Sequence, residues 1–149
     1  MVSRDYEDLF KAFTAHRIKY FVVGAHAVIY YTEPRFTKDI DIWVPPELND
    51  PAKVYKALKS FGAPLKGVSP KDFQDEEMIY QIGVAPIRID IMMGMEGASA
   101  RLAWQKRERS RYGKTSISIL SKEDLMNAKR KAGRPADLLD LKRLKGRKK

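Results

Sequence analysis

The sequence has no cysteine and only two histidines. The absence of cysteine excludes disulfides, thiolate zinc sites and cysteine nucleophiles, and two histidines are too few for a histidine-rich metal site. No apolar run approaches the roughly 18 residues that a membrane span needs, and the N-terminus has no signal-peptide core. We therefore expect a cytoplasmic protein without membrane contact.

Acidic residues are also few, most of all toward the C-terminus. The chain carries 29 Lys or Arg against 19 Asp or Glu, a formal net charge of +10. Residues 129–149 hold ten of the basic residues and only two acidic ones, so this segment accounts for +8 of the total. Such a basic C-terminus predicts nucleic-acid contact, while the bland alternative is a solvated helix face.

Helical and extended patterns alternate along the 149 residues. Periodicity predicts helices over 5–17, 50–62 and 98–109, a short one after Gly24, and two more after Ser121 and Pro135. It predicts strands over 18–24, 38–44, 78–83, 86–92 and 115–120, of which the third and fourth form a hairpin. The expected fold is one α/β (α+β) domain with a mixed sheet flanked by helices. Its core covers about 1–120, and 121–149 forms a short C-terminal helical extension and basic tail.

Three aspartates interrupt two of these predicted strands. In RFTKDIDIWV (35–44), Asp39 and Asp41 share one face of a strand, and PIRIDIM (86–92) places Asp90 beside Arg88 in the same way. Neighbouring carboxylates repel one another and resist burial unless a cation or hydrogen-bond donors compensate them. The three side chains therefore indicate a site for Mg²⁺, or for Mn²⁺ in its place. The alternative is an exposed strand end where the charges cost little.

A glycine turn supplies a second possible component. The strand ending in VVG (22–24) passes directly into a helix, whose first backbone N–H groups suit a phosphate. Arg35 and Thr37 could add a cationic clamp and a hydroxyl. A strand, a glycine and a helix also follow one another in many α/β proteins, so this signal is weak alone.

The order of these motifs resembles the DNA polymerase β-like nucleotidyltransferase superfamily, and most closely its small prokaryotic members akin to the AbiEii-type toxin nucleotidyltransferases. The resemblance rests on four stretches: KYFVVGAHAV, EPRFTKDIDIWV, IYQIGVAPIRIDIM and LMNAKRKAGRPADLLDL. It implies that Asp39, Asp41 and Asp90 are catalytic metal ligands. It also implies nucleotide binding by Gly24, Ala25, Lys129 and Arg134, although the second turn position in the superfamily is usually Gly or Ser.

The expected function is the metal-dependent transfer of a nucleoside monophosphate from an NTP to a hydroxyl of RNA or protein. The alternative is a catalytically silent module of the same fold that binds nucleic acid or protein, such as a toxin–antitoxin component. An aminoglycoside acceptor is disfavoured because the basic tail would repel a cationic drug. Among other residues, we expect Trp43 and Trp104 to fill the core, Arg88 to be a structural charge partner of the aspartates, and His26, Asp137 and Asp140 to have structural roles.

Overall fold

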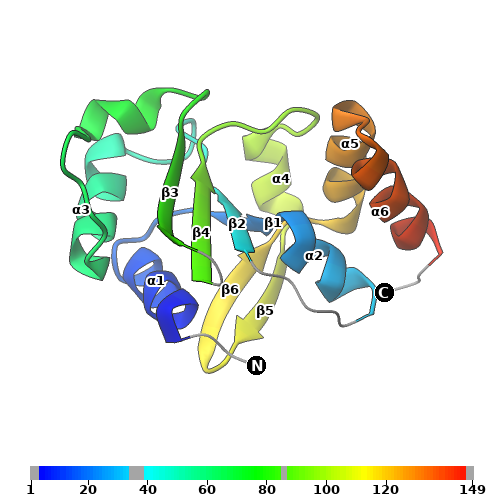
Figure 1. Cartoon of the computed structure of the whole chain (residues 1–149), viewed down its shortest axis with the longest axis horizontal. Coiled ribbons are helices and arrows are strands. Elements are labelled where there is room, and N and C mark those ends of the chain that lie inside the picture. Colours follow the sequence, from blue (N-terminus) through cyan, green and yellow to red (C-terminus); the bar gives the residue numbers. More distant parts are fainter. Residues whose placement is uncertain (1–3, 34–38, 85–86, 147–149) are drawn as a thin grey trace.

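The computed structural model describes residues 4–33, 39–84 and 87–146 (Figure 1). Its elements in chain order are α1 (Arg4–Ala15), β1 (Phe21–Val23), α2 (Gly24–Tyr31), β2 (Asp39–Trp43), α3 (Pro51–Phe61), the 3₁₀ helix η1 (Pro70–Gln74), β3 (Ile79–Val84), β4 (Ile87–Met92), α4 (Ala100–Lys106), β5 (Glu108–Tyr112), β6 (Thr115–Ile119), α5 (Lys122–Ala132) and α6 (Pro135–Lys145). The predicted α/β class with a mixed sheet is confirmed.

Six strands form one sheet in the order β3-β4-β2-β1-β6-β5. The β2–β4 and β1–β6 pairs are parallel, whereas β1–β2, β3–β4 and β5–β6 are antiparallel. The predicted hairpin of the third and fourth strands is therefore confirmed as β3–β4. In Figure 1, α1 and α3 lie at one end of the sheet and α5 and α6 at the other. No helix of the described ranges is both long and apolar enough to cross a membrane.

The hydrophobic core joins these helices to the central strands. Leu9, Phe10 and Phe13 of α1 are completely buried, because they recur at helical spacing on one face. Phe21 of β1 stacks on Trp43 of β2 with ring centroids 4.9 Å apart. Trp43 is thus a core residue, as expected, and Trp104 packs against Phe21 edge to face from α4.

Helix ends follow local chemistry. Asp50 caps α3 by accepting a hydrogen bond from the backbone N–H of Ala52 at 2.9 Å, and Ser121 caps α5 by accepting from the N–H of Asp124 at 3.1 Å. Gly133 ends α5 with a left-handed φ of 65°. Pro135 then begins α6, so the chain turns between two helices that pack against each other.

Two predictions of secondary structure were wrong. The helix expected over 98–109 ends at Lys106, and Glu108–Tyr112 forms the edge strand β5. Every residue of β5 pairs with one of β6, so β5 is defined by its pairing with β6 and not by a periodic pattern of its own. Between α3 and β3, where no helix was predicted, Pro70–Gln74 forms η1. Its Phe73 is buried against Tyr80 of β3.

Candidate functional site

Two of the predicted carboxylates lie opposite each other on parallel strands. Asp41 of β2 and Asp90 of β4 are register partners, and the Asp90 carboxylate is close enough to raise the pKa of Asp41. Asp39 shares the face of Asp41 and is the register partner of Arg88. The alternation of side chains along both strands therefore gathers the three aspartates on one face of the sheet.

Arg88 lies between Asp39 and Asp90. Its guanidinium is 2.9 Å from Asp39 Oδ2 and 3.1 Å from Asp90 Oδ1. It also donates from Nη2 to Asp90 Oδ2 at 3.2 Å. The expectation that Arg88 is a charge partner of the aspartates thus agrees with the geometry. Asp90 Oδ1 and Arg88 Nε are nevertheless both buried without a hydrogen-bond partner, because the short separation is not aligned for a hydrogen bond.

Asp41 is electrostatically perturbed by its surroundings. Burial raises the pKa of Asp41 to about 6, and the negative charges of Asp90 and Asp39 add to the rise. The Lys129 ammonium opposes this rise of the Asp41 pKa. Asp41 is thus a carboxyl group whose negative charge is only partly compensated, and Lys129 of α5 supplies part of that compensation.

The glycine turn lies directly against Asp41. Gly24 begins α2 with a left-handed φ of 64°, and a Cβ built there would overlap Asp41 Oδ2. Only glycine satisfies both the backbone conformation and the close approach. The first backbone N–H groups of α2, from Gly24 and Ala25, accordingly lie beside the carboxylates.

The C-terminal helices supply the cations. Lys129 Nζ of α5 is 3.3 Å from Asp137 Oδ1 and 3.1 Å from Asp140 Oδ2 of α6. Arg134, between the helices, donates from Nε to Asp137 Oδ2 at 2.6 Å. Asp137 also accepts from the backbone N–H of Arg134 at 3.2 Å. These contacts hold the pKa of Asp137 below its ordinary value, chiefly through the Arg134 hydrogen bond and also through Lys129.

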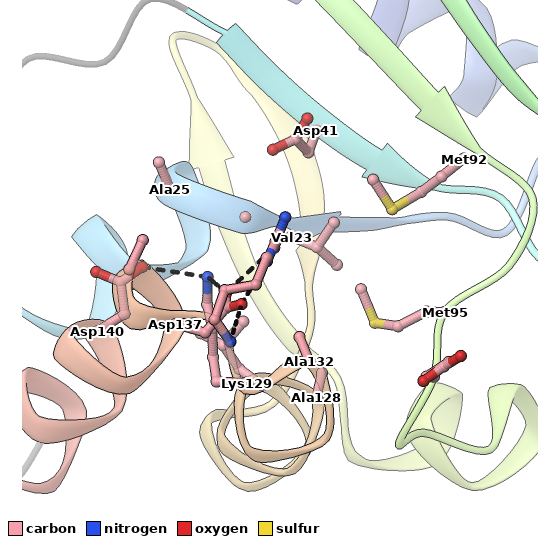
Figure 2. A pocket seen from close by; sticks show the side chains of 15 residues that line it. Val23, Ala25, Asp41, Met92, Met95, Ala128, Lys129, Ala132, Asp137 and Asp140 are labelled. Carbon is pink, nitrogen blue, oxygen red and sulfur yellow. Dashed lines mark hydrogen bonds and ion pairs between the residues drawn. The ribbon is translucent and has the colours of Figure 1, made fainter.

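One pocket of about 520 Å³ joins the two groups. Its walls include Val23, Gly24, Ala25, Asp41, Met92, Met95, Glu96, Ala128, Lys129, Ala132, Arg134, Asp137 and Asp140. Figure 2 shows Asp41 across the pocket from Lys129, with Met92 and Met95 along a third side. The volume lies within the roughly 300–1,000 Å³ range of small-molecule sites. The space thus has an acidic wall at Asp41, a wall of paired basic and acidic side chains from α5 and α6, and an apolar wall.

Of the predicted site residues, Gly24, Ala25, Asp41, Lys129 and Arg134 all line this pocket. Asp39 and Asp90 stand beside Asp41 on the sheet. Arg35 and Thr37 lie outside the described residues.

His26 and the basic C-terminal end of α6 were also expected to have structural or binding roles. His26 packs edge to face on Tyr6 with its Nε2 buried and unpartnered, and burial lowers its pKa. The predicted basic tail is in part the end of α6, where Leu144 is completely buried. Arg143 there lies 3.6 Å from Asp140. Residues 147–149 lie outside the described residues.

Sequence reasoning assigned Asp137 and Asp140 only a structural role on their own helix. The structure instead places them between α5 and α6, buried, pairing with Lys129 and lining the pocket. One signal in the sequence could have indicated this: the two aspartates are three residues apart in one helix, and a lysine and a glycine turn precede them. The apolar wall of Met92 and Met95 was missed because nothing in their local sequence distinguishes them from core methionines.

The carboxylate group suits a divalent cation by its donor chemistry. Among the residues that the structure describes, no group of three or more His, Asp or Glu is arranged as it stands to hold a metal ion. Asp41 and Asp90 nevertheless offer adjacent carboxylate oxygens on one face, and Asp90 Oδ1 is buried and accepts no hydrogen bond, although Arg88 Nε lies 3.1 Å from it. Carboxylate oxygens are hard donors of the kind that Mg²⁺ and Mn²⁺ prefer. The residues present therefore fit such an ion.

Solved structures share this fold. No protein-family model and no curated protein sequence matches the chain. A candidate nucleotidyltransferase from Thermotoga maritima superposes with a TM-score of 0.60 at 16% identity, covering 98% of this chain and 96% of its own. The lincosamide antibiotic adenylyltransferase LnuA, solved with lincomycin, gives 0.56 at 17% identity over 97% of each chain. ANT(2'')-Ia in complex with adenylyl-2''-tobramycin gives 0.57 at 15% identity, over 93% of this chain and 84% of its own. The chain has the nucleotidyltransferase fold.

Proposed function

We propose that the protein is a metal-dependent nucleotidyltransferase that moves a nucleoside monophosphate from an NTP to an acceptor hydroxyl. One observation carries the proposal: Asp41, with Asp90 beside it on the neighbouring strand, faces Lys129 across a pocket that begins at the Gly24 turn. In this reaction the acceptor oxygen forms a bond to the α-phosphorus. The bond from that phosphorus to the bridging oxygen breaks, and pyrophosphate and a proton are released.

The chain's own residues would bind and orient the nucleotide. The backbone N–H groups of Gly24 and Ala25 would bind phosphate oxygens at the N-terminus of α2. Lys129 would meet the triphosphate from the opposite wall, held at its place by Asp137 and Asp140. Positioning and charge neutralisation are the main sources of catalysis in phosphoryl and nucleotidyl transfer.

Asp41 and Asp90, with Asp39, would hold the divalent ion, Mg²⁺ or Mn²⁺. Bound there, the ion would supply positive charge to the reacting phosphate oxygens. Arg88 would keep Asp39 oriented on the same face, since it contacts Asp39 and Asp90 together.

The names of the neighbours support the reaction class. LnuA is an adenylyltransferase, and ANT(2'')-Ia was solved with an adenylylated product. For this chain we propose a hydroxyl of RNA or protein as the acceptor, because its strongly basic composition favours an anionic partner. We also propose that the chain is related to the AbiEii-type toxin nucleotidyltransferases.

A second function is favoured by one observation. Arg88 already neutralises part of the negative charge of Asp39 and Asp90. A protein that uses this fold only for binding would need no metal ion to neutralise these carboxylates. Such a module, for example a toxin–antitoxin component, would bind nucleic acid or protein but would not consume NTP.

Labelled NTPs with Mg²⁺ or Mn²⁺, incubated with total RNA and with cell lysate, separate the two functions. We expect a labelled macromolecule with wild type and none with Asp41→Asn. Asp8→Asn serves as the matched control, because Asp8 is an exposed carboxylate on α1 away from the pocket. Melting curves in EDTA and in Mg²⁺ plus NTP accompany the assay. If wild type labels nothing and gains no thermal stability from Mg²⁺ with any NTP, the enzyme proposal fails.

A further inference from the structure

A second hollow, with a different chemistry, lies at the other end of β1. It has a volume of about 320 Å³ and is lined by Thr14, Arg17, Ile18, Lys19, Tyr20, Trp104, Arg109, Ser116, Ile117 and Ser118. We call it the basic hollow. It shares no lining residue with the pocket at Asp41. Three of its residues are cationic, four carry hydroxyl groups, and none is acidic.

The β5–β6 hairpin builds one side of the hollow. Its buried positions are Thr115, Ile117 and Ile119 of β6. The opposite face presents Arg109 paired with Ser118 and Arg111 paired with Ser116. Because side chains alternate along strands, both arginines and both serines point to the same side. Figure 1 shows this hairpin beside α1, whose C-terminal end supplies the other side.

The positive charges of this region are not paired with carboxylates of the part of the chain that the structure describes. None of Arg17, Lys19, Arg109 and Arg111 forms an ion pair with another described residue. Lys19 and Arg107 instead lie over the Trp104 ring, at 5.8 Å and 3.7 Å from its centroid. Burial and the neighbouring charge of Arg109 lower the pKa of Arg107, whose buried Nε has no hydrogen-bond partner. Mutual repulsion of this kind is relieved when an anion binds.

Arg17 occupies a position that normally belongs to glycine. The N–H of Ile18 donates to Phe13 O at 2.9 Å and the N–H of Arg17 donates to Thr14 O at 3.1 Å, which is the Schellman arrangement at the end of α1. The residue at its left-handed position is Arg17, with φ 57°, and no other described non-glycine residue has a positive φ. A strained conformation of this kind is a reason to look for function. Here it places the arginine at the hollow.

We propose that the basic hollow and the adjoining face of the β5–β6 hairpin bind the phosphodiester backbone of single-stranded nucleic acid. Cations that form no ion pair with a described carboxylate, with hydroxyl groups beside them, are suited to contact backbone phosphates. Arg111 continues the basic line beyond the hollow, about 6.8 Å along the strand from Arg109. A charged line favours a polymer over a single small anion.

The shape of the site favours a single strand. A concave space of about 320 Å³ admits one phosphate with its sugar, and a flexible strand can bend into it. A duplex is a stiff rod that would touch only the rim. The site needs neither a metal nor a nucleotide, so it stands or falls independently of the proposed transfer reaction.

Fluorescence anisotropy with a labelled oligouridylate in EDTA, over a series of salt concentrations, tests the proposal. Arg17→Gly should weaken binding several-fold while leaving the melting temperature unchanged or higher, because glycine suits the left-handed position. The double variant Arg109→Gln/Arg111→Gln should weaken binding roughly tenfold. It should also reduce the salt slope by about 1.4, at about 0.7 per phosphate contact on a single strand.

Lys53→Gln/Lys59→Gln is the control with the same loss of charge, on exposed positions of α3. It should bind nearly as wild type does, and a labelled DNA duplex should bind more weakly than the oligouridylate. An equal loss in the α3 control would show that only net charge matters and would overturn the proposal. So would equally tight binding of the duplex, or displacement of the oligouridylate by stoichiometric inorganic triphosphate, which would indicate a site for small anions.

Discussion

Replacing Gly24 with alanine tests whether the turn and the carboxylate group form one unit. Alanine at this position must adopt the left-handed conformation with φ 64°, and this backbone strain costs about 1–2 kcal/mol. It would also lie 3.0 Å from Asp41 Cβ and Cγ and overlap Oδ2. The Asp41 side chain must therefore rotate away from its preferred conformation, at a further cost of about 0.5–1.5 kcal/mol. The expected loss in the free energy of unfolding is about 2–3 kcal/mol.

Gly133→Ala is the matched control for the backbone cost. Gly133 has nearly the same φ, 65°, and an added Cβ would meet only Arg130 O at an ordinary 3.6 Å. This variant should lose only the about 1–2 kcal/mol of backbone strain. Urea unfolding followed by circular dichroism measures both variants under the same conditions. Gly24→Ala should in addition abolish nucleotide transfer, because its Asp41 is displaced.

Combining Gly24→Ala with Asp41→Ala isolates the clash. Removal of the Asp41 carboxylate takes away the overlapping Oδ2 atom and Cγ and leaves only Asp41 Cβ at 3.0 Å, so the cost of the methyl group at position 24 should then fall toward its cost at position 133. The expected coupling energy between the two sites is about 1 kcal/mol, in the range for residues in contact. Equal costs for Gly24→Ala and Gly133→Ala in the wild-type background would refute the reasoning.

Three further predictions concern charge. Asp137→Asn should lower the free energy of unfolding by about 3 kcal/mol at neutral pH, as for a broken buried ion pair. Because the folded pKa of Asp137 is depressed, this stabilisation is complete above its unfolded pKa and is lost as pH falls through the folded value, so urea melts of mutant and wild type should converge below about pH 4. Arg88→Gln should melt at a lower temperature in EDTA and gain more from Mn²⁺ than wild type, since it exposes the repulsion among the aspartates; identical melting curves would contradict this. For the basic C-terminus, Lys142→Gln/Lys145→Gln should reduce the salt slope of RNA binding by about 1.4, and an unchanged slope would mean that this end is only solvated. Point substitutions are preferable to a C-terminal truncation here, because deleting the end of α6 would also remove the buried Leu144.

The sequence predicted the sheet-borne half of the site because strands obey a simple rule. Asp39 and Asp41 alternate with buried Ile40 and Ile42, so one face of β2 had to be acidic. Asp90 repeats the pattern in β4. The sequence did not show that β2 pairs with β4. In the structure the two strands are parallel neighbours, and their register brings Asp41 opposite Asp90.

The helical half could not be predicted in the same way. Asp137 and Asp140 face Lys129 only because Gly133 reverses the chain and α6 packs on α5. That contact depends on the packing angle of two helices, which local periodicity does not encode. The strand β5 was missed for a related reason. Its residues Glu108, Arg109 and Arg111 carry no apolar alternation, so only the partner strand β6 defines it.

The stacking of aromatic rings around Phe21 gives the molecule an internal optical reporter. The chain has two tryptophans, and both contact Phe21, Trp43 by stacking and Trp104 edge to face. Trp43 lies two residues from Asp41 on the same strand. Trp104 lines the basic hollow, and the Arg107 guanidinium lies over its ring. With Trp104→Phe, the remaining emission would report the environment of the carboxylates. With Trp43→Phe, it would report the hollow. Intrinsic fluorescence could therefore follow occupancy at each end of β1 separately, without an attached dye.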